Sequence, residues 1–340
     1  MLRDLLKIIG ESALFSRKTP RFWHENGFIP QLLIPFAVIY FILKRIFSSR
    51  AKPQKFEAKI ICIGNAIAGG AGKTPAAIAV YKELQKQKPA AKICFVSTAF
   101  RAKIYGPEKI DISKHTVADV GDEAFLLASH GNAVICKNRV KAVEYAISLG
   151  FTYIILDDGL HDKRIHKDIT FLMIDGNYGF GNGLILPCGP LRDRLDYAVE
   201  GTDHIILIGE DKTKAVEQVN AFTKKKYPVI RSFIDTTTKI DETNIYVAFA
   251  GIGRPQKFFD TLKNDMKLVV AETVEFPDHH TYNESDFETL NNIAASQKAK
   301  LITTEKDFVK LPKEFAANVE CLKIELQFDD GQVPQILNKL

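Results

Sequence analysis

The sequence predicts an α/β fold, with a doubly wound, mostly parallel sheet followed by a second, smaller α/β domain. Three observations carry this prediction. Short apolar runs alternate with helical patterns, a glycine-rich loop joins the first run to the first helix, and another run ends in two aspartates. The chain has 340 residues, 46% of them hydrophobic and 26% charged, which is a globular composition and long enough for two cores.

Apolar runs rich in β-branched residues predict buried parallel strands. In the first part of the chain such runs lie at residues 59–64, 92–97, 132–136, 151–156, 170–174 and 204–208. Helical spacing of apolar residues separates them at 76–87, 122–128 and 139–149. This alternation of strand and helix is typical of a parallel sheet built from βαβ units.

A second series of runs begins near residue 239. It predicts strands at 245–250, 267–274, 300–303 and 321–326, and helices at 255–262 and 285–297. We therefore expect three parts, an N-terminal membrane-anchoring segment at 1–54, a P-loop domain at 55–235 and a smaller C-terminal α/β domain at 236–340.

Charge is concentrated at the N-terminus. The first 55 residues contain ten Lys or Arg and three Asp or Glu, a net charge of +7, whereas the whole chain carries +5. The remainder is therefore slightly acidic, which argues against a nucleic-acid-binding face and favours a basic segment on an anionic membrane surface. The five cysteines are widely spaced without a CxxC pair, which disfavours zinc and disulfide frameworks and suggests a reducing cytoplasm.

Residues 27–43 form a stretch of seventeen residues without a charge, followed at once by Lys44 and Arg45. A helix that crosses a bilayer needs about 20 apolar residues, so this stretch is at the short limit. Pro30 and Pro35 would bend it. We expect a membrane-inserted anchor that spans the bilayer or lies half-buried in it, and a buried core helix is the alternative. No small-residue cleavage site follows, so a secretory signal peptide fits poorly.

A glycine-rich loop at residues 65–75 joins the strand at 59–64 to the helix at 76–87. This is the structural context of a P-loop, in which main-chain N–H groups and the helix N-terminus favour phosphate. We expect a nucleotide to bind the loop, with Lys73 on the β- and γ-phosphates and the Thr74 hydroxyl on Mg²⁺. The candidate nucleotide-binding residues are Gly69, Gly70, Ala71, Gly72, Lys73 and Thr74.

The loop departs from the strict pattern G-x-x-x-x-G-K-[ST] at one position, where Ile67 replaces the first glycine. A glycine turn with an incidental lysine is the alternative interpretation. The strand before the loop and the helix after it favour the P-loop, and Pro75 suits the first turn of that helix.

The strand at 151–156 is followed by Asp157, Asp158 and Gly159. An apolar strand that ends in aspartate beside a P-loop is the Walker-B arrangement, because ligands gather at the carboxyl ends of parallel strands. We expect Asp157 and Asp158 to join Thr74 around Mg²⁺. Without the P-loop, the same residues would indicate only a turn.

These features, taken in order, resemble the tetraacyldisaccharide 4'-kinase family, the lipid A kinases of Gram-negative bacteria. The resemblance covers most of the chain, and its spacing makes it specific although each string alone is weak. It rests on residues 20–23 (PRFW), 64–75, 120–123 (VGDE), 156–160 (LDDGL), 183–192 (GLILPCGPLR), 250–255 (AGIGRP), 276–280 (FPDHH) and 303–307 (TTEKD).

The resemblance implies a concrete activity. Such an enzyme transfers the γ-phosphate of ATP to the 4'-hydroxyl of a tetraacylated glucosamine disaccharide 1-phosphate, a membrane-embedded precursor of lipid A. It acts with Mg²⁺ at the cytoplasmic face of the bacterial inner membrane. We expect no nucleic-acid partner and infer no obligate protein partner.

A sugar hydroxyl must be oriented and must lose its proton during attack, so a carboxylate or imidazole is needed near the γ-phosphate. The resemblance assigns Asp122 as the catalytic base and His279 as its partner, with Asp278 able to orient the imidazole ring. Glu123 would join the Mg²⁺ shell and Arg192 would lie near the nucleotide.

Alternatives remain for these residues. Asp122 could cap the helix that follows it, and Asp278 and His279 could belong to a simple turn. The choice between His279 and His280 is open, and Arg192 could form a surface ion pair.

Two stretches depart from the family pattern. Residues 97–100 (STAF) stand where the family has Ser-Arg-Gly-Tyr, and His161-Asp162 stands where it has Gln-His. Both changes suggest altered substrate contacts or weak activity. Two other function classes are considered. One is a membrane-associated P-loop ATPase or GTPase switch acting through protein partners, and the other, based on these two departures, is a catalytically silent homologue. The absence of a guanine-specificity motif in the sequence disfavours a GTPase.

Overall fold

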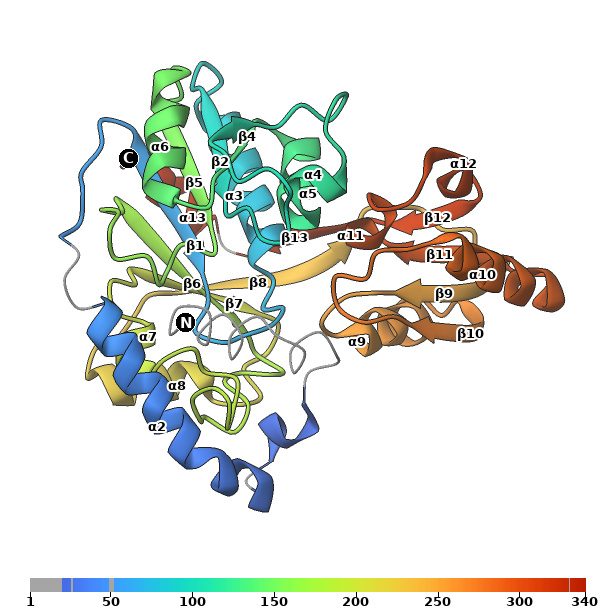
Figure 1. Ribbon diagram of the computed structural model, residues 1–340, viewed down its shortest axis with the longest axis horizontal. Coiled ribbons are helices and arrows are strands. Elements are labelled where there is room, and N and C mark those ends of the chain that lie inside the picture. Colours follow the sequence, from blue (N-terminus) through green and yellow to red (C-terminus); the bar gives the residue numbers. More distant parts are fainter. Residues whose placement is uncertain (1–19, 26, 49–51, 330) are drawn as a thin grey trace. The chain divides into compact units, whose positions relative to one another are not determined.

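The computed structural model describes residues 20–25, 27–48, 52–329 and 331–340 (Figure 1). Contacts divide these residues into two compact units. The larger one comprises Arg21–Asp235 together with Glu325–Leu340, and the smaller one Thr236–Ile324. Residues 1–19, part of the expected anchoring segment, lie outside the described residues.

Within the described residues the larger unit contains a nine-stranded sheet with the order β13-β8-β7-β6-β1-β5-β2-β4-β3. Pairing is parallel from β8 through β7, β6, β1, β5 and β2 to β4, and the short edge strand β3 is antiparallel to its neighbour β4. The strands are β1 (Lys59–Gly64), β2 (Ile93–Ser97), β3 (Glu108–Lys109), β4 (Ala133–Ile135), β5 (Tyr153–Asp157), β6 (Ile169–Asp175), β7 (His204–Ile208), β8 (Val229–Thr236) and β13 (Ile324–Phe328).

Helices cover both faces of this sheet, which confirms the doubly wound fold (Figure 1). In β1, Ile61 and Ile63 pack in a core with α3 and α5, whereas Ile60 packs with α6, because successive side chains of a strand point to opposite faces. The helices of this unit are η1 (Arg21–His24), α2 (Phe28–Ser48), α3 (Lys73–Gln87), α4 (Val117–Val120), α5 (Asp122–His130), α6 (Arg139–Ser148), α7 (Leu195–Ala198), α8 (Ala215–Thr223) and α13 (Gln332–Asn338).

The smaller unit has a four-stranded parallel sheet, within the residues described, with the order β10-β9-β11-β12. Its strands are β9 (Ile245–Ala250), β10 (Val269–Glu275), β11 (Lys300–Thr304) and β12 (Val319–Leu322). Its helices are α9 (Pro255–Asp260), the π-helical turn η2 (Thr261–Asp265), α10 (Glu284–Gln297), α11 (Glu305–Phe308) and α12 (Lys313–Ala316).

The end of the chain differs from the expected domain boundary. The run at 321–326 is not one strand, because the chain leaves the smaller sheet after β12 and joins the larger sheet as β13. Helix α13 then packs against α3, and its Val333 and Leu337 are fully buried in the core of the larger unit. The segment 236–340 is therefore not a single domain, and its last sixteen residues, Glu325–Leu340, belong to the P-loop unit.

Strand β8 has no counterpart among the expected strands. Its buried and exposed residues alternate, so it lacks the continuous apolar run that marks the other strands of the sheet. The expected helix at 255–262 corresponds to α9, which continues without a break into η2.

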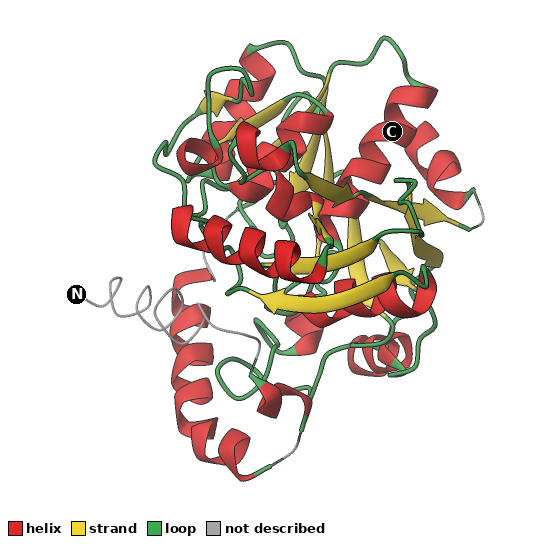
Figure 2. Cartoon of the chain, turned by 90° about the vertical axis from the view of Figure 1, so that its right-hand side faces the viewer, coloured by secondary structure: helices red, strands yellow, loops and turns green. Residues whose placement is uncertain are grey.

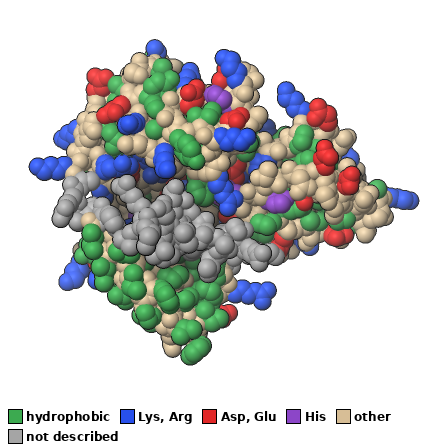
Figure 3. All heavy atoms as spheres, viewed as in Figure 1, with side chains coloured by type: hydrophobic (Ala, Val, Ile, Leu, Met, Phe, Trp, Pro, Cys, Tyr) green, Lys and Arg blue, Asp and Glu red, His purple; other side chains and the backbone are tan. Residues whose placement is uncertain are grey.

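Helix α2 is exposed along most of its length (Figures 1 and 2). Its stretch Phe28–Ile46 is long and apolar enough to cross a membrane, and only 6% of that stretch is buried. Figure 3 shows hydrophobic side chains gathered over this part of the molecule. This exposure disfavours the alternative of a buried core helix, and Pro35 lies inside the helix. The exposed large apolar residues of α2 are Phe28, Ile29, Leu32, Ile34, Phe36, Val38, Ile39, Ile42 and Ile46.

Candidate active site

The glycine-rich loop has the backbone that its sequence predicts. Gly69 and Gly72 have φ angles of 107° and 77°, which glycine adopts without strain. At Gly72 a Cβ atom would lie 2.4 Å from Cδ1 of Ile208, so no larger residue fits between the loop and β7 without movement. Space around Gly69 and Gly70 is open, with no atom within 4 Å of a Cβ placed there. The loop therefore leaves room above the N-terminus of α3.

Lys73 and Thr74 begin α3 and face the carboxyl end of β5. The Thr74 hydroxyl lies 3.3 Å from Oδ2 of Asp157, and Nζ of Lys73 lies 3.9 Å from Oδ1 of Asp158. Since β5 is paired with β1 in parallel register, both strands deliver their ends to the same edge of the sheet. The Walker-B arrangement expected from the sequence is present in the fold.

Asp157 and Asp158 lie in opposite electrostatic surroundings. Burial and the nearby Glu123 carboxylate raise the pKa of Asp157 to about 7, although Lys73 opposes the shift. Burial also disfavours the charge on Asp158, but Arg192, Lys73 and Arg139 outweigh it and lower the pKa of Asp158 below its usual value. Asp158 also has a φ of 56°, a left-handed conformation that is costly for a residue with a side chain.

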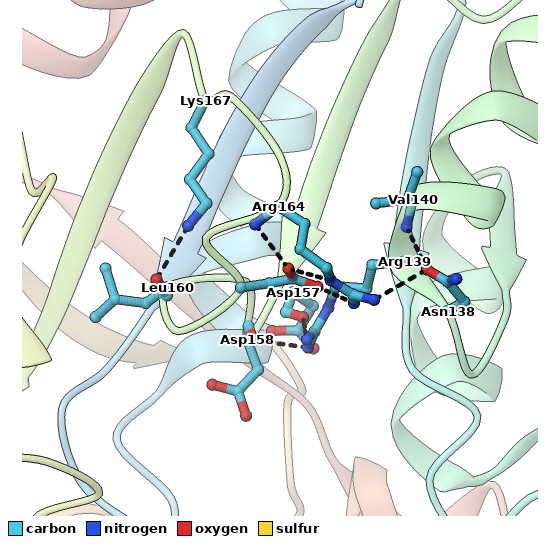
Figure 4. A network of polar contacts seen from close by, with 9 residues as sticks. Asn138, Arg139, Val140, Asp157, Asp158, Leu160, Arg164 and Lys167 are labelled. Carbon is cyan, nitrogen blue, oxygen red and sulfur yellow. Dashed lines mark hydrogen bonds and ion pairs between the residues drawn. The ribbon is translucent and has the colours of Figure 1, made fainter. Parts of the chain in front are cut away.

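Arg139 supports this strained turn. Its Nη2 donates to the carbonyl oxygens of Asp158 at 2.6 Å and of Asp157 at 3.3 Å (Figure 4). Asn138 accepts a bond from the main-chain N–H of Val140, so Arg139 is held at the start of α6. The sequence argument missed Arg139, and only its place at a helix start after a strand could have signalled it.

Arg192 is the cation closest to Asp158. Its Nη1 lies 2.7 Å from Oδ2 of Asp158. Its main-chain N–H donates to the carbonyl of Ala66 in the P-loop at 2.9 Å. The structure therefore brings Arg192 to both the P-loop and the Walker-B aspartates, as expected for a residue near the nucleotide, and Arg192 is not an isolated surface ion pair.

The second stretch that departs from the family pattern, His161-Asp162, has clear hydrogen-bond partners. His161 lies 3.1 Å from the carbonyl of Asn65, and burial, reinforced by Arg192, lowers its pKa to about 3. The ring is therefore neutral at pH 7 and donates from Nε2 to that carbonyl. Asp162 pairs with Arg164 through two hydrogen bonds, of 2.9 and 2.6 Å.

Asp122 and Glu123 begin α5. Oδ1 of Asp122 accepts from the main-chain N–H of Glu123 at 3.0 Å, and Asp122 is buried to 7% exposure. Gly121 rather than Asp122 occupies the N-cap position of α5, which disfavours the alternative in which Asp122 only caps the helix. The Glu123 carboxylate acts electrostatically on both Asp157 and Arg192, so α5 delivers its first turn to the phosphate site.

In the smaller unit, His279 and His280 have different carboxylate partners. Nε2 of His279 is 3.8 Å from Asp278, whereas Nε2 of His280 is 2.9 Å from Asp286. His279 has a left-handed backbone with a φ of 58°, and its N–H donates to the carbonyl of Gly251. His279 and Asp122 lie in different units, so the pairing of these two residues stays a prediction.

The TTEKD stretch, for which the sequence suggested no role, stabilises the same loop. Asp307 is fully buried and accepts from the N–H of Gly251 at 3.0 Å and from the Thr304 hydroxyl at 2.8 Å. Nζ of Lys310 lies 2.6 Å from its other oxygen. A buried carboxylate thus holds the turn after β9 against which His279 is hydrogen-bonded.

The donor set fits Mg²⁺ in part. Among the described residues, Oδ1 of Asp157 is buried without a hydrogen-bond partner, and a cation beside it would relieve that cost. In the same part of the chain no three His, Cys, Asp or Glu side chains converge to hold a metal by themselves. Mg²⁺ with nucleotide needs only one or two carboxylates, so Thr74 and Asp157 fit, whereas Asp158 is already paired with Arg192.

Comparison with known proteins identifies the family to which the chain belongs. The family described as tetraacyldisaccharide-1-P 4'-kinase (LpxK) matches residues 29–340. The chain belongs to this kinase family. The match spans both units, so it does not favour the alternative of an ATPase switch, which the P-loop alone would allow.

Relatives in this family cover nearly the whole chain. The tetraacyldisaccharide 4'-kinase of Rhodospirillum rubrum is 34% identical over 315 residues, which are 92% of this chain and 94% of the relative. The enzyme of Rickettsia canadensis is 35% identical, with 94% of this chain and 95% of the relative covered. That of Parvibaculum lavamentivorans is 37% identical, with 86% of both chains covered.

The fold agrees with a solved structure of the kinase family. LpxK from Aquifex aeolicus, crystallised in complex with ATP, matches this chain with a TM-score of 0.73 and 22% sequence identity. The match covers 91% of this chain and 98% of that one. The α/β fold with its two units is thus the fold of the tetraacyldisaccharide-1-P 4'-kinases.

Proposed function

We propose that the chain transfers the γ-phosphate of ATP to the 4'-hydroxyl of a tetraacylated glucosamine disaccharide 1-phosphate. The family match over residues 29–340 supports this activity, and one geometric observation supports the chemistry. Lys73, Arg192 and the Walker-B aspartates meet at the mouth of a glycine-rich loop. Cations placed there stabilise the charge that develops on a transferred phosphoryl group.

The residues around the glycine-rich loop have different roles in binding the nucleotide and Mg²⁺. Main-chain N–H groups of residues 69–74 and the N-terminus of α3 bind the nucleotide phosphates, and Lys73 contacts the outer ones. Thr74 and Asp157 would hold Mg²⁺, with Glu123 and Asp158 close by, and the ion would supply positive charge against the phosphates. Arg192, which is paired with Asp158 and keeps that carboxylate ionised, would contact the same phosphates.

The sugar hydroxyl needs a base. Asp122 is a buried carboxylate at the start of α5, next to Glu123, whose charge reaches Asp157. We assign Asp122 as the group that accepts the hydroxyl proton. His279 is assigned as its imidazole partner and Asp278 as the residue that orients the ring.

The lipid acceptor also explains α2. A helix with nine large exposed apolar side chains and with Lys44 and Arg45 near its C-terminal end suits insertion into a bilayer. We propose that the chain works on its lipid at the cytoplasmic face of the inner membrane.

The test is a phosphate-transfer assay with the Asp122→Asn variant. Protein in detergent receives γ-labelled ATP, Mg²⁺ and the tetraacylated disaccharide 1-phosphate. We expect wild type to label the lipid, and Asp122→Asn to lose about 10²- to 10⁴-fold in kcat while its affinity for ATP is kept. The matched control is Asp111→Asn, an exposed carboxylate in a turn of the same unit, which should label the lipid like wild type.

Two results would count against the proposal. A wild-type chain that binds ATP but labels no lipid would exclude this acceptor. A variant at Asp122 with unchanged kcat would leave the kinase assignment standing but remove Asp122 from the role of base.

A further inference from the structure

A loop between β6 and α7, residues 179–193, lies between the membrane helix and the P-loop. We call it the strap. It contains the stretch GLILPCGPLR, of which the proposed mechanism uses only Arg192. Its two edges make main-chain contacts with two different parts of the chain, and these contacts are the basis of the inference.

On one side the strap is bonded to the P-loop. Leu191 forms an antiparallel bridge with Ile67. The N–H of Ala68 donates to the carbonyl of Pro190 at 2.7 Å, and the N–H of Arg192 donates to the carbonyl of Ala66 at 2.9 Å. These bonds make the strap a short extra strand along the P-loop, so a shift of one displaces the other.

On the other side the strap is bonded to the segment before α2. The indole Nε1 of Trp23 donates to the carbonyl of Pro187 at 3.1 Å. The N–H of Asn182 donates to the carbonyl of Trp23 at 2.7 Å, and its side-chain amide donates to the carbonyl of Phe22 at 3.1 Å. Trp23 is only 3% exposed, so the start of the membrane segment is firmly seated on the strap.

The far end of α2 returns to the strap at Arg192. The Tyr40 hydroxyl donates to the carbonyl of Arg192 at 3.2 Å and Nζ of Lys44 donates to the same oxygen at 2.6 Å. Lys44 also pairs with the buried carboxylate of Asp193 at 3.1 Å. One carbonyl thus accepts two bonds from the membrane helix.

Arg192 therefore links the membrane helix to the phosphate site through a single residue. Its carbonyl is held by α2, its N–H is held by the P-loop, and its guanidinium is held by Asp158. Apart from these contacts, the stacking of Arg45 on Tyr197 and the seat of Trp23 before the helix, α2 is largely exposed. A change in how α2 is seated would reach the phosphate site through the main chain of Arg192.

We propose that Lys44 and Tyr40 are positioning residues, which hold the strap in register with the P-loop and so transmit the seating of α2 in the membrane to Arg192. This rests on the proposed kinase function. Neither residue touches ATP in this scheme. They act through the Arg192 main chain, and their loss lets Arg192 and the P-loop edge shift.

The test compares Lys44→Met with Lys44→Arg and with the control Lys82→Met. Lys82 forms an ion pair with Glu325 on the same unit, with no contact to the strap, so the control removes one paired lysine elsewhere. With saturating ATP, we expect Lys44→Met to lower kcat about tenfold or more while KM for the lipid changes by less than about threefold. Lys44→Arg, which keeps the charge and a donor, should restore most of kcat, and Lys82→Met should behave like wild type.

Trp23, the single tryptophan of the chain, reports independently of activity. Its emission should be unchanged in Lys44→Met, since its bonds to the strap are elsewhere. A red shift of the emission would show that Lys44→Met is unfolded. Tyr40→Phe then replaces it as the test variant, because this substitution removes only a single hydroxyl. We expect a severalfold lower kcat for it, and an unchanged kcat would then overturn the proposal.

The remaining outcomes are distinct. A wild-type chain without lipid labelling defeats the kinase assignment, and the coupling is then measured by binding of a fluorescent ATP analogue, which Lys44→Met should weaken severalfold. Unchanged kcat and unchanged ATP binding in Lys44→Met overturn the positioning role. An effect on KM for the lipid alone also overturns it, because it shows that Lys44 contacts only the acceptor.

Discussion

Asp157 and Asp158 are neighbours with the same side chain, yet their surroundings give them opposite proton affinities. Asp157 ends β5 in a buried position near Glu123, so its pKa is raised to about 7. Asp158 turns toward Arg192 and Lys73, which keep it ionised. Such a divergence of pKa values is typical of a functional site. Here Asp158 is already paired with a cation, whereas Asp157, among the described residues, is not.

The raised pKa of Asp157 has a consequence for stability. Because the folded-state pKa of about 7 exceeds the ordinary value of 3.8, the folded protein holds the proton more tightly than the unfolded chain. The stabilising contribution is therefore fully present below about pH 4 and is lost as the pH rises through about 7.

We predict that Asp157→Asn, without nucleotide or metal, unfolds at a higher temperature than wild type above pH 7. The gain should be at most about 4 kcal/mol, and it should vanish near pH 4, where wild type is also uncharged. Thermal unfolding between pH 4 and 8.5 measures it. Addition of Mg²⁺ and ATP should stabilise wild type more than the variant. A variant that melts below wild type at pH 8 would contradict the assignment, since the charge would then be compensated without a ligand.

At the level of elements, α2 combines an apolar surface with a polar end. Its nine exposed large apolar side chains are spread along the helix, while Tyr40 and Lys44, near its C-terminal end, hold the strap. Arg45 stacks on Tyr197 of α7, with its guanidinium 3.2 Å from the ring centroid. The element is thus anchored to the P-loop unit at one end and suited to lipid elsewhere.

We predict that Ile39→Glu releases the protein from membranes. Ile39 is 53% exposed near the middle of the apolar stretch, and a charged residue at the centre of a membrane helix costs roughly 2.5–3.5 kcal/mol. Binding to phosphatidylglycerol-containing vesicles, measured by flotation, should fall more than about tenfold. The control Phe222→Glu changes an exposed apolar residue of α8 and should bind like wild type. Equal flotation of both variants would show that α2 is not the membrane contact.

At the scale of the whole molecule, the C-terminal residues return to the larger unit. After the smaller unit the chain returns to the larger sheet as β13 and places α13 on α3. Val333 and Leu337 then fill a core shared with α3, the helix that begins at the P-loop. The last residues of the chain therefore support the nucleotide-binding element rather than the domain that precedes them.

We predict that Leu337→Ala destabilises the larger unit by about 2–5 kcal/mol, because it leaves a cavity in a fully buried site. Amide hydrogen exchange should rise in α3, about 250 positions earlier in the chain, and less in β9 to β12. The control Asn338→Ala changes an exposed neighbour and should leave exchange unchanged. Faster exchange confined to the smaller unit would contradict this account of the C-terminus.

Local sequence patterns were sufficient to predict much of the fold and of the candidate site. Continuous apolar runs predicted the central strands because those strands are buried on both faces, and the glycine loop and paired aspartates predicted their own positions at strand ends. Local patterns failed to predict elements whose buried and exposed residues alternate, and elements whose place is set by contacts between residues far apart in the chain. Strand β8 was missed for the first reason, and the division of 319–328 between two sheets for the second.

The sequence by itself determined the fold class, the phosphate-binding loop, the acidic strand end and the apolar helix, because each depends on residues that are neighbours along the chain. Only the tertiary structure decided that Arg139 braces the turn at Asp158, that Arg192 links α2 to the P-loop, and that the C-terminal helix returns to α3. These contacts join residues far apart in the chain, and no local pattern records which distant residues meet.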